Sequence, residues 1–167
     1  DKPEANGRTA LYIACQQGHL DIVRFLVDEA QADVEKAMTD GFTPLFIACQ
    51  EGHLDIVRFL VEEAQADVEK AATGGCTPLI VATGLGHLEI VQFLVTEAQA
   101  DVSKATTEGH GFTPLYGAAY NGHVQMVKFL LGSGLANGNQ TLGDGHNVLP
   151  FVCDNKDVEI CGRLLVA

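Results

Sequence analysis

The chain has 167 residues, 47% of them hydrophobic, which suits one domain with a buried core. Asp and Glu outnumber Lys and Arg by 22 to 10, and a formal net charge of −12 would repel a phosphate backbone, so we expect no nucleic-acid partner. No apolar run of about 18 residues occurs, so we expect no membrane insertion.

The chain opens on the end of a repeating unit. Residues 1–7 read DKPEANG and align with EKAMTDG at 35–41. We therefore interpret the first residues as the tail of an earlier unit, and Asp1 is not expected to be a natural start.

The tripeptides TAL, TPL, TPL, TPL and NVL recur along the chain. They begin at residues 9, 43, 77, 113 and 147, so the successive steps are 34, 34, 36 and 34 residues. Such a period predicts a repeat architecture, because each unit must bury its apolar side against its neighbours. We predict a single domain over 1–167, with units of about 6–39, 40–73, 74–109, 110–143 and an incomplete 144–167.

The second unit shows the elements that each unit should form. TDGFTPL at 39–45 combines an Asp-Gly turn signal with a Thr that can cap a helix and a Pro suited to its first turn. This predicts a short helix over 44–51, ended by Gly52. HLDIVRFLVEEA at 53–64 has a helical apolar stripe and predicts a longer second helix, followed by an extended return to the next turn.

The block DGFTPLFIACQEGHLDIVRFLVEEAQADV at 40–68 resembles the ankyrin repeat, whose pattern D-G-x-T-P-L-H-x-A precedes G-H, an apolar helix and A-D-V. The resemblance covers about 6–167. It implies an all-α solenoid of stacked helix-turn-helix units with β-hairpin-like loops. The tetratricopeptide repeat has a similar period of about 34 residues, but it needs Trp landmarks and this chain has no Trp.

Two features depart from the family pattern. The histidine expected after T-P-L, which normally bridges neighbouring repeats, is replaced, and its bridging is therefore in question. The extra residue of the 34-residue period falls in EEAQADV at 62–68, so we expect an altered exit from the second helix. The residues that stand in place of the histidine are Tyr12, Phe46, Ile80, Tyr116 and Pro150.

The histidines and cysteines follow the repeat spacing. His19, His53, His87 and His123 lie one unit apart, which is too far to converge on one metal ion, and the resemblance implies that they bond loop backbone beside the next repeat. The five cysteines have no CxxC spacing and are interpreted as small buried residues in a reducing compartment.

A group of potential ligands in the last unit is weighed against the repeat pattern. His146, Cys153, Asp154, Asp157 and Cys161 have the residue types of a metal site, but Cys153 and Asp157 stand where framework residues stand in other units. We therefore expect no metal, no cofactor and no catalytic residue.

The positions that change between units are the candidates for binding. They are the loop tip before each first helix, the residue after T-P-L, and the end of the first helix. The resemblance implies that these positions line a concave face, where a row of Tyr and Phe is typical of interface anchors. The candidates are Arg8, Tyr12, Gln16, Phe42, Phe46, Gln50, Ile80, Leu85, His110, Phe112, Tyr116 and Tyr120.

Alternatives remain open within this set. Tyr12, Phe46, Ile80 and Tyr116 could instead pack in the space of the missing histidine, whereas Phe42 and Phe112, at turns, favour partner contact. TTEGHGFTPL at 106–115 carries a two-residue insertion, which is either neutral drift of a loop or a determinant of specificity.

The sequence predicts a non-catalytic, monomeric module that binds a partner protein or peptide. We expect it in the cytoplasm, with the nucleus as the alternative. The alternative function is a spacer or regulatory segment of a larger enzyme or membrane-associated protein. The fifth unit, with Pro150 and Gly162 inside its helices, is expected to fray first.

Overall fold

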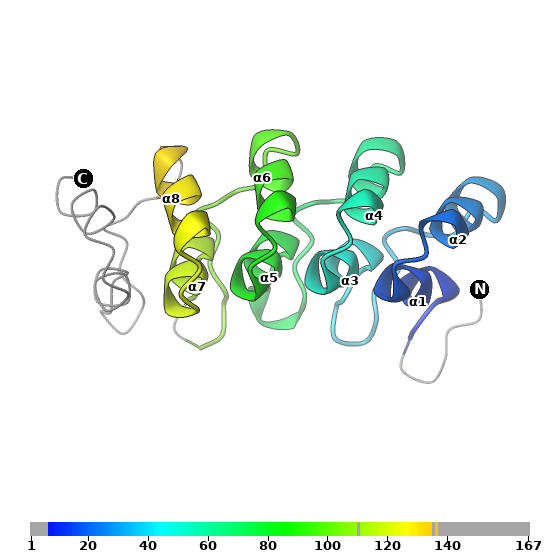
Figure 1. Ribbon diagram of the computed structural model, residues 1–167. Coiled ribbons are helices and arrows are strands. Elements are labelled where there is room, and N and C mark those ends of the chain that lie inside the picture. The colour runs from blue at the N-terminus through cyan, green and yellow to red at the C-terminus, as the bar shows by residue number, and fades with distance from the viewer. Residues whose placement is uncertain (1–6, 110, 135, 137–167) are drawn as a thin grey trace.

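The computed structural model describes residues 7–109, 111–134 and 136. Helix pairs stand side by side in a row, with the first helices along one side and the second helices along the other (Figure 1). No strand occurs among these residues, and the all-α prediction is confirmed. The α-helices are α1 (Ala10–Gln17), α2 (Leu20–Arg24), α3 (Pro44–Glu51), α4 (Leu54–Arg58), α5 (Pro78–Leu85), α6 (Leu88–Thr96), α7 (Pro114–Tyr120) and α8 (Val124–Gly132); the π turns are η1 (Phe25–Glu29) and η2 (Phe59–Glu63), and η3 (Thr73–Gly75) is a 3-10 turn.

Local chemistry sets the bounds of the first helices. The hydroxyl oxygen of Thr43 accepts a hydrogen bond from the N–H of Phe46 at 3.1 Å, and Pro44 occupies the first turn of α3. The helix ends at Gly52, whose φ of 84° is accessible to glycine without steric cost. The predicted helix over 44–51 is confirmed. The same threonine cap begins the other first helices, at Thr9, Thr77 and Thr113.

The second helices of the first two units end in a π turn. The helix predicted over 53–64 passes from α4 into the π turn η2, in which the N–H of Ala64 bonds to the carbonyl of Phe59 at 3.0 Å. A π turn closes over five residues rather than four, which accommodates the additional residue of this repeat. Gln65 follows with φ of 58°, and its side-chain amide donates to the carbonyl of Glu62 at 3.1 Å. The expected alteration of the helix exit is confirmed.

The core runs without interruption along the row. Leu45 and Cys49 are buried on α3, and Val57 and Leu60 are buried on the second helix of the same unit. Equivalent apolar residues of the neighbouring units belong to the same cluster. Because each unit buries its apolar side against the next, the stability of the row resides largely in its interfaces.

The loops before the first helices form hairpin-like tips that are linked to one another. Within one tip, the N–H of Met38 donates to the carbonyl of Phe42 at 3.0 Å. Between tips, the N–H of Thr73 donates to the carbonyl of Asp40 at 2.9 Å, and an equivalent bond joins the next two tips. The tips therefore form a row that runs alongside the row of first helices.

Candidate functional site

The repeated histidines tie each unit to the one before it. They share a hydrogen bond between ring Nε2 and a backbone carbonyl oxygen: His53 with Gln16 (3.2 Å), His87 with Gln50 (2.9 Å) and His123 with Gly84 (3.1 Å). Since a carbonyl oxygen only accepts, Nε2 carries the proton in each case. For these three histidines the expected structural role is confirmed, with the correction that each bond runs to the first helix of the preceding repeat rather than to loop backbone beside the next.

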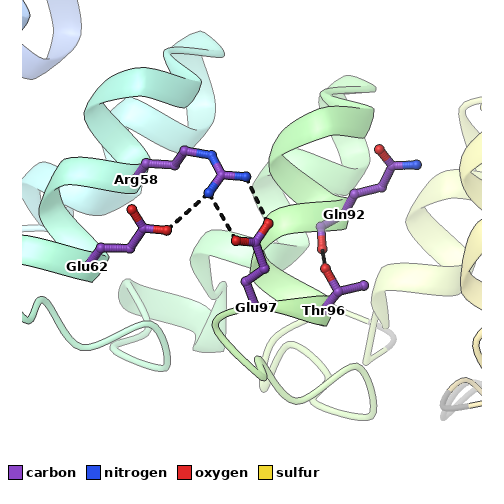
Figure 2. A network of polar contacts seen from close by, with 5 residues as sticks. All are labelled: Arg58, Glu62, Gln92, Thr96 and Glu97. Atoms are coloured by element: carbon purple, nitrogen blue, oxygen red, sulfur yellow. Dashed lines mark hydrogen bonds and ion pairs between the residues drawn. The ribbon is translucent and has the colours of Figure 1, made fainter.

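A second set of inter-repeat contacts lies on the second-helix face, which consists of α2, α4, α6 and α8 with their π turns. The guanidinium of Arg58 lies 4.4 Å from the ring centroid of Phe93 and donates hydrogen bonds of 3.0 and 2.8 Å to the carboxylate of Glu97 (Figure 2). Arg58 also pairs with Glu62 of its own unit at 3.0 Å. The hydrogen bonds between Arg58 and Glu97 raise the pKa of the arginine and lower the pKa of the glutamate.

The same bridge joins the first two units. Arg24 lies 4.5 Å from the ring centroid of Phe59 and donates hydrogen bonds of 3.0 and 2.7 Å to Glu63. Sequence reasoning missed these bridges because arginine and glutamate lie 39 residues apart. The available signal was the repetition of Arg-Phe and of a glutamate five residues after the arginine in the first two units.

The interface between the third and fourth units lacks this bridge. Gln92 stands where Arg58 stands one unit earlier, and Ser133 stands where Glu97 stands. Phe129 keeps the aromatic position. In Figure 2 the Gln92 side chain points away from Glu97, and its backbone carbonyl accepts a hydrogen bond from the Thr96 hydroxyl at 2.8 Å.

The first-helix face consists of α1, α3, α5 and α7 with the loop tips that precede α3, α5 and α7. Most of its predicted aromatic candidates are involved in packing. The residues after T-P-L are at most 8% exposed, so their burial supports the alternative that they fill the space of the missing histidine. These residues are Tyr12, Phe46, Ile80 and Tyr116.

The two aromatic tips are half-buried rather than free. Phe42 stacks on Phe46 with ring centroids 4.7 Å apart, and Phe112 lies 5.1 Å from the ring centroid of Tyr116. Each tip ring therefore lies on a buried ring of the following helix. From the sequence, a position at a turn was not expected to be buried. Stacking on the following helix nevertheless buries Phe42 and Phe112 in part. Partner contact at Phe42 and Phe112 remains a prediction.

The ends of α5 and α7 present apolar side chains to solvent. Tyr120 is 61% exposed and stacks on Tyr116 at 6.0 Å, and Leu85 is 53% exposed. Positions equivalent to Leu85 carry Gln17, Glu51 and Asn121, all exposed. The positions equivalent to Tyr120 are Gln16, Gln50 and Gly84. An apolar residue at a position that is polar and exposed elsewhere is not explained by packing between units.

Two glycines lie beside these apolar residues. Gly84 in α5 and Gly117 in α7 have ordinary helical backbone, so neither needs the conformational freedom of glycine. A Cβ on Gly84 would meet nothing closer than Asn121 Nδ2 at 4.0 Å, and one on Gly117 would meet Gly84 Cα at 3.9 Å. Because a helical glycine costs about 1 kcal/mol relative to alanine, helix formation does not explain either glycine, and neither carries a side chain at the ends of α5 and α7 near Leu85 and Tyr120. Sequence reasoning noted Gly84 only as a variable position.

The first two units give this face a polar character. Nη2 of Arg8 donates to Oε1 of Gln16 at 2.5 Å, and its guanidinium lies 5.8 Å from the ring centroid of Tyr12. Burial raises the pKa of Tyr12; Arg8 opposes that shift, and the carboxylates of Glu51 and Asp40 add to it. Gln50 donates to Glu51 at 3.1 Å. His110, the remaining candidate, lies outside the described residues.

The described residues also include cysteines and potential metal ligands. Burial raises the pKa of the Cys15 thiol to about 12 and raises that of Cys49 as well, so both remain protonated at neutral pH. No group of three His, Cys, Asp or Glu side chains in the described ranges could hold a metal ion. No helix there is long and apolar enough to cross a membrane. The ligand-type residues His146, Cys153, Asp154, Asp157 and Cys161 lie outside the described ranges, as does the fifth unit.

Comparison with known proteins gives one match. The family model described as ankyrin repeats (3 copies) matches residues 1–72 and 66–141. A search of curated proteins found no match.

Proposed function

The chain belongs to the ankyrin-repeat family, and we propose on that premise that it binds another protein through its first-helix face without catalysing a reaction. Ankyrin repeats are general protein–protein interaction modules and are typically non-catalytic. The first-helix face carries the tips and first-helix ends that, by the family resemblance, are expected to line a concave binding surface.

The exposed pair Leu85 and Tyr120 carries this proposal. Both project from the ends of adjacent first helices, at positions where the other units carry polar residues or glycine. Tyrosine is enriched among the residues that dominate binding energy at interfaces, because its ring buries a large area at a small entropy cost. The space left by Gly84 and Gly117 beside Tyr120 would admit an apolar side chain of the partner.

The charge of the same face defines the partner further. The segments 7–17, 40–51, 73–85 and 107–121, which contribute the tips and first helices, carry the carboxylates of Asp40, Glu51 and Glu108 and a single cationic side chain, Arg8. A partner segment with a bulky apolar side chain and a nearby basic side chain would match both features. Its association should accelerate as the salt concentration falls, because complementary charge acts mainly on the rate of encounter.

A matched pair of variants tests the proposal. The double variant Leu85→Gln, Tyr120→Gln introduces the residue type of the equivalent positions Gln17, Gln16 and Gln50, and it should fold as the wild type does. Phe25→Gln is the control, because Phe25 is 60% exposed on the second-helix side of the first unit. The proteins are used to capture partners from the native source, the captured partners are identified by mass spectrometry, and their affinities are then measured with purified components.

The expected result is loss of at least tenfold in affinity for the double variant, with Phe25→Gln unchanged. Equal affinity of the double variant and the wild type would overturn the assignment of the first-helix face. Equal losses in both variants would indicate nonspecific apolar adhesion. Capture of no specific partner by the wild type would favour the alternative function, a spacer or regulatory segment of a larger protein. We further propose a monomer in the cytoplasm or nucleus.

A further inference from the structure

On the second-helix face, a phenylalanine occupies the same position at three successive interfaces. At two of these interfaces an arginine of the preceding unit lies over its ring. At the first two interfaces an arginine from one unit lies over a phenylalanine ring of the next, Arg24 on Phe59 and Arg58 on Phe93, at 4.5 and 4.4 Å. At the third interface the ring is supplied by Phe129, but Gln92 occupies the arginine position. At both of the other interfaces, therefore, the group over the phenylalanine ring is a guanidinium.

An open hollow of about 490 Å³ lies at the unfilled position. It extends over the outer sides of α4, α6 and α8. Its lining includes the Arg58–Phe93 pair, Glu89, Gln92 and Phe129. Gln92 and Glu89 are exposed, and Phe129 is half-buried, so a side chain approaching from solvent can reach the ring.

We propose that this hollow binds the guanidinium of an arginine side chain of a partner protein, in the place that Arg24 and Arg58 fill at the other interfaces. This second site lies on the face opposite to the one proposed above and does not depend on it. The ligand class follows from the internal comparison, because the same ring position takes an arginine wherever the chain provides one.

The charges around the hollow favour a cation. Glu89 and Glu97 contribute carboxylates, and the guanidinium of Arg58 is already paired with Glu97 and Glu62. The hollow therefore carries more negative than positive charge. The hollow lacks one group that the first two interfaces have. Ser133 stands where a glutamate accepts two hydrogen bonds from the guanidinium at those interfaces. A lone arginine should therefore bind with a dissociation constant on the order of millimolar.

The proposal also predicts selectivity for arginine over lysine. A planar guanidinium can stack on an aromatic ring while its edges bond to carboxylates, whereas an ammonium group is a compact, strongly hydrated charge. Titration with Nα-acetyl-L-arginine amide should shift the NMR signals of the Phe129 ring and the Gln92 side-chain amide along a saturable curve. Nα-acetyl-L-lysine amide should bind at least fivefold more weakly.

Two variants and one control decide the matter. Gln92→Arg supplies the missing side chain from within the protein and should abolish the response to added arginine amide. Phe129→Leu keeps an apolar side chain but removes the ring and should weaken binding severalfold. Gln125→Arg adds the same charge at an exposed position of α8 outside the hollow and should bind as the wild type does.

Several results would overturn the proposal. They are a non-saturable response, equal binding of lysine amide, or wild-type binding by Gln92→Arg. A loss in Gln125→Arg equal to that in Gln92→Arg would reduce the effect to bulk charge. Binding of free L-arginine but not of its blocked amide would point to an amino-acid site rather than a side-chain site. The double variant Leu85→Gln, Tyr120→Gln should still bind arginine amide, so this proposal and the one for the first-helix face fail independently.

Discussion

The two faces of the row differ in how closely the units repeat one another. On the second-helix face, Arg24 and Arg58 make the same contacts with the next unit, to within about 0.2 Å in each distance. On the first-helix face, equivalent positions carry residues as different as Gln50, Gly84 and Tyr120. The repeated residues Arg24 and Arg58 meet equivalent neighbours, whereas the varied residues Leu85 and Tyr120 are exposed to solvent.

This difference separates stability from recognition within one small domain. A contact that recurs at each interface contributes to the nearest-neighbour energy that holds the row together. A residue that varies and stays exposed, such as Leu85, contributes little to that energy and is available for binding. Substitutions on the two faces should therefore give opposite results in assays of unfolding and of affinity.

The largest expected effect is at a repeated position. Phe59 is 2% exposed beneath Arg24, and Phe59→Ala should lower the free energy of unfolding by about 3–5 kcal/mol through lost burial and a cavity. Phe25 lies in the same ten-residue sequence, GHLDIVRFLV, but is 60% exposed. Phe25→Ala should change stability by less than about 0.5 kcal/mol. Urea denaturation of both variants checks this, and similar losses would contradict the burial-based assignment.

A smaller effect of mixed sign is expected at Gly84. Gly84→Gln introduces the residue of the two preceding units, and it should stabilise α5 by about 0.5 kcal/mol through helix propensity. The same side chain fills the space beside Tyr120, so partner affinity should fall at least fivefold. Gly84→Ala is the control, because its Cβ has room and should raise stability without changing affinity. A loss of stability in Gly84→Gln would show that the glycine is needed for packing.

The exit of the second helices gives a third prediction. A non-glycine residue with positive φ is strained by about 1–2 kcal/mol, and Gln65 has φ of 58°. Gln65→Gly should therefore raise the free energy of unfolding by about 0.5–1 kcal/mol, after the lost bond to Glu62 and the greater freedom of the unfolded chain are subtracted. The melting temperature measures this. A decrease would mean that the glutamine bond outweighs the backbone strain.

The smallest effect concerns acid stability. Hydrogen bonding to Arg24 and Arg58 lowers the pKa values of Glu63 and Glu97 in the folded state. A depressed carboxyl pKa contributes stability above its unfolded pKa, about 4.3, and this contribution is lost as the pH falls through the folded value. The double variant Arg24→Ala, Arg58→Ala should therefore lose less stability than the wild type on acidification below about pH 4.5. Parallel urea titrations at pH 7 and pH 3.5 measure the difference, which high salt should reduce.

An equal loss of stability on acidification in the wild type and in the double variant would contradict a contribution of the two arginine–glutamate bridges. The comparison needs the variant to be folded at pH 7, which circular dichroism establishes. Because the side chains of Glu63 and Glu97 are exposed, at 54% and 50%, solvent screens both ion pairs and the effect belongs at the small end of this series.

Most of the fold could be predicted from the sequence because its signals act over a few residues. The cap of Thr43, the turn at Gly52 and the 34-residue period all depend on local backbone chemistry, and each was confirmed. The spacing of the histidines excluded a shared metal ion and the family resemblance implied their structural role, although neither gave the direction of the bond from His53 to the preceding unit. The family assignment needed only these local patterns.

The site depended on the placement of neighbouring units, which local chemistry does not specify. Phe25 and Phe59 lie in the same ten-residue sequence, yet Phe59 is buried beneath the guanidinium of Arg24 from the neighbouring unit, whereas Phe25 is 60% exposed. Likewise, the sequence placed Phe46 and Tyr120 in one set of candidate anchors, but packing buried the first and left the second exposed. Burial depends on two surfaces in contact. The sequence therefore identified the candidate binding residues, whereas the stacking of one unit on the next decided which of them are buried and which are exposed.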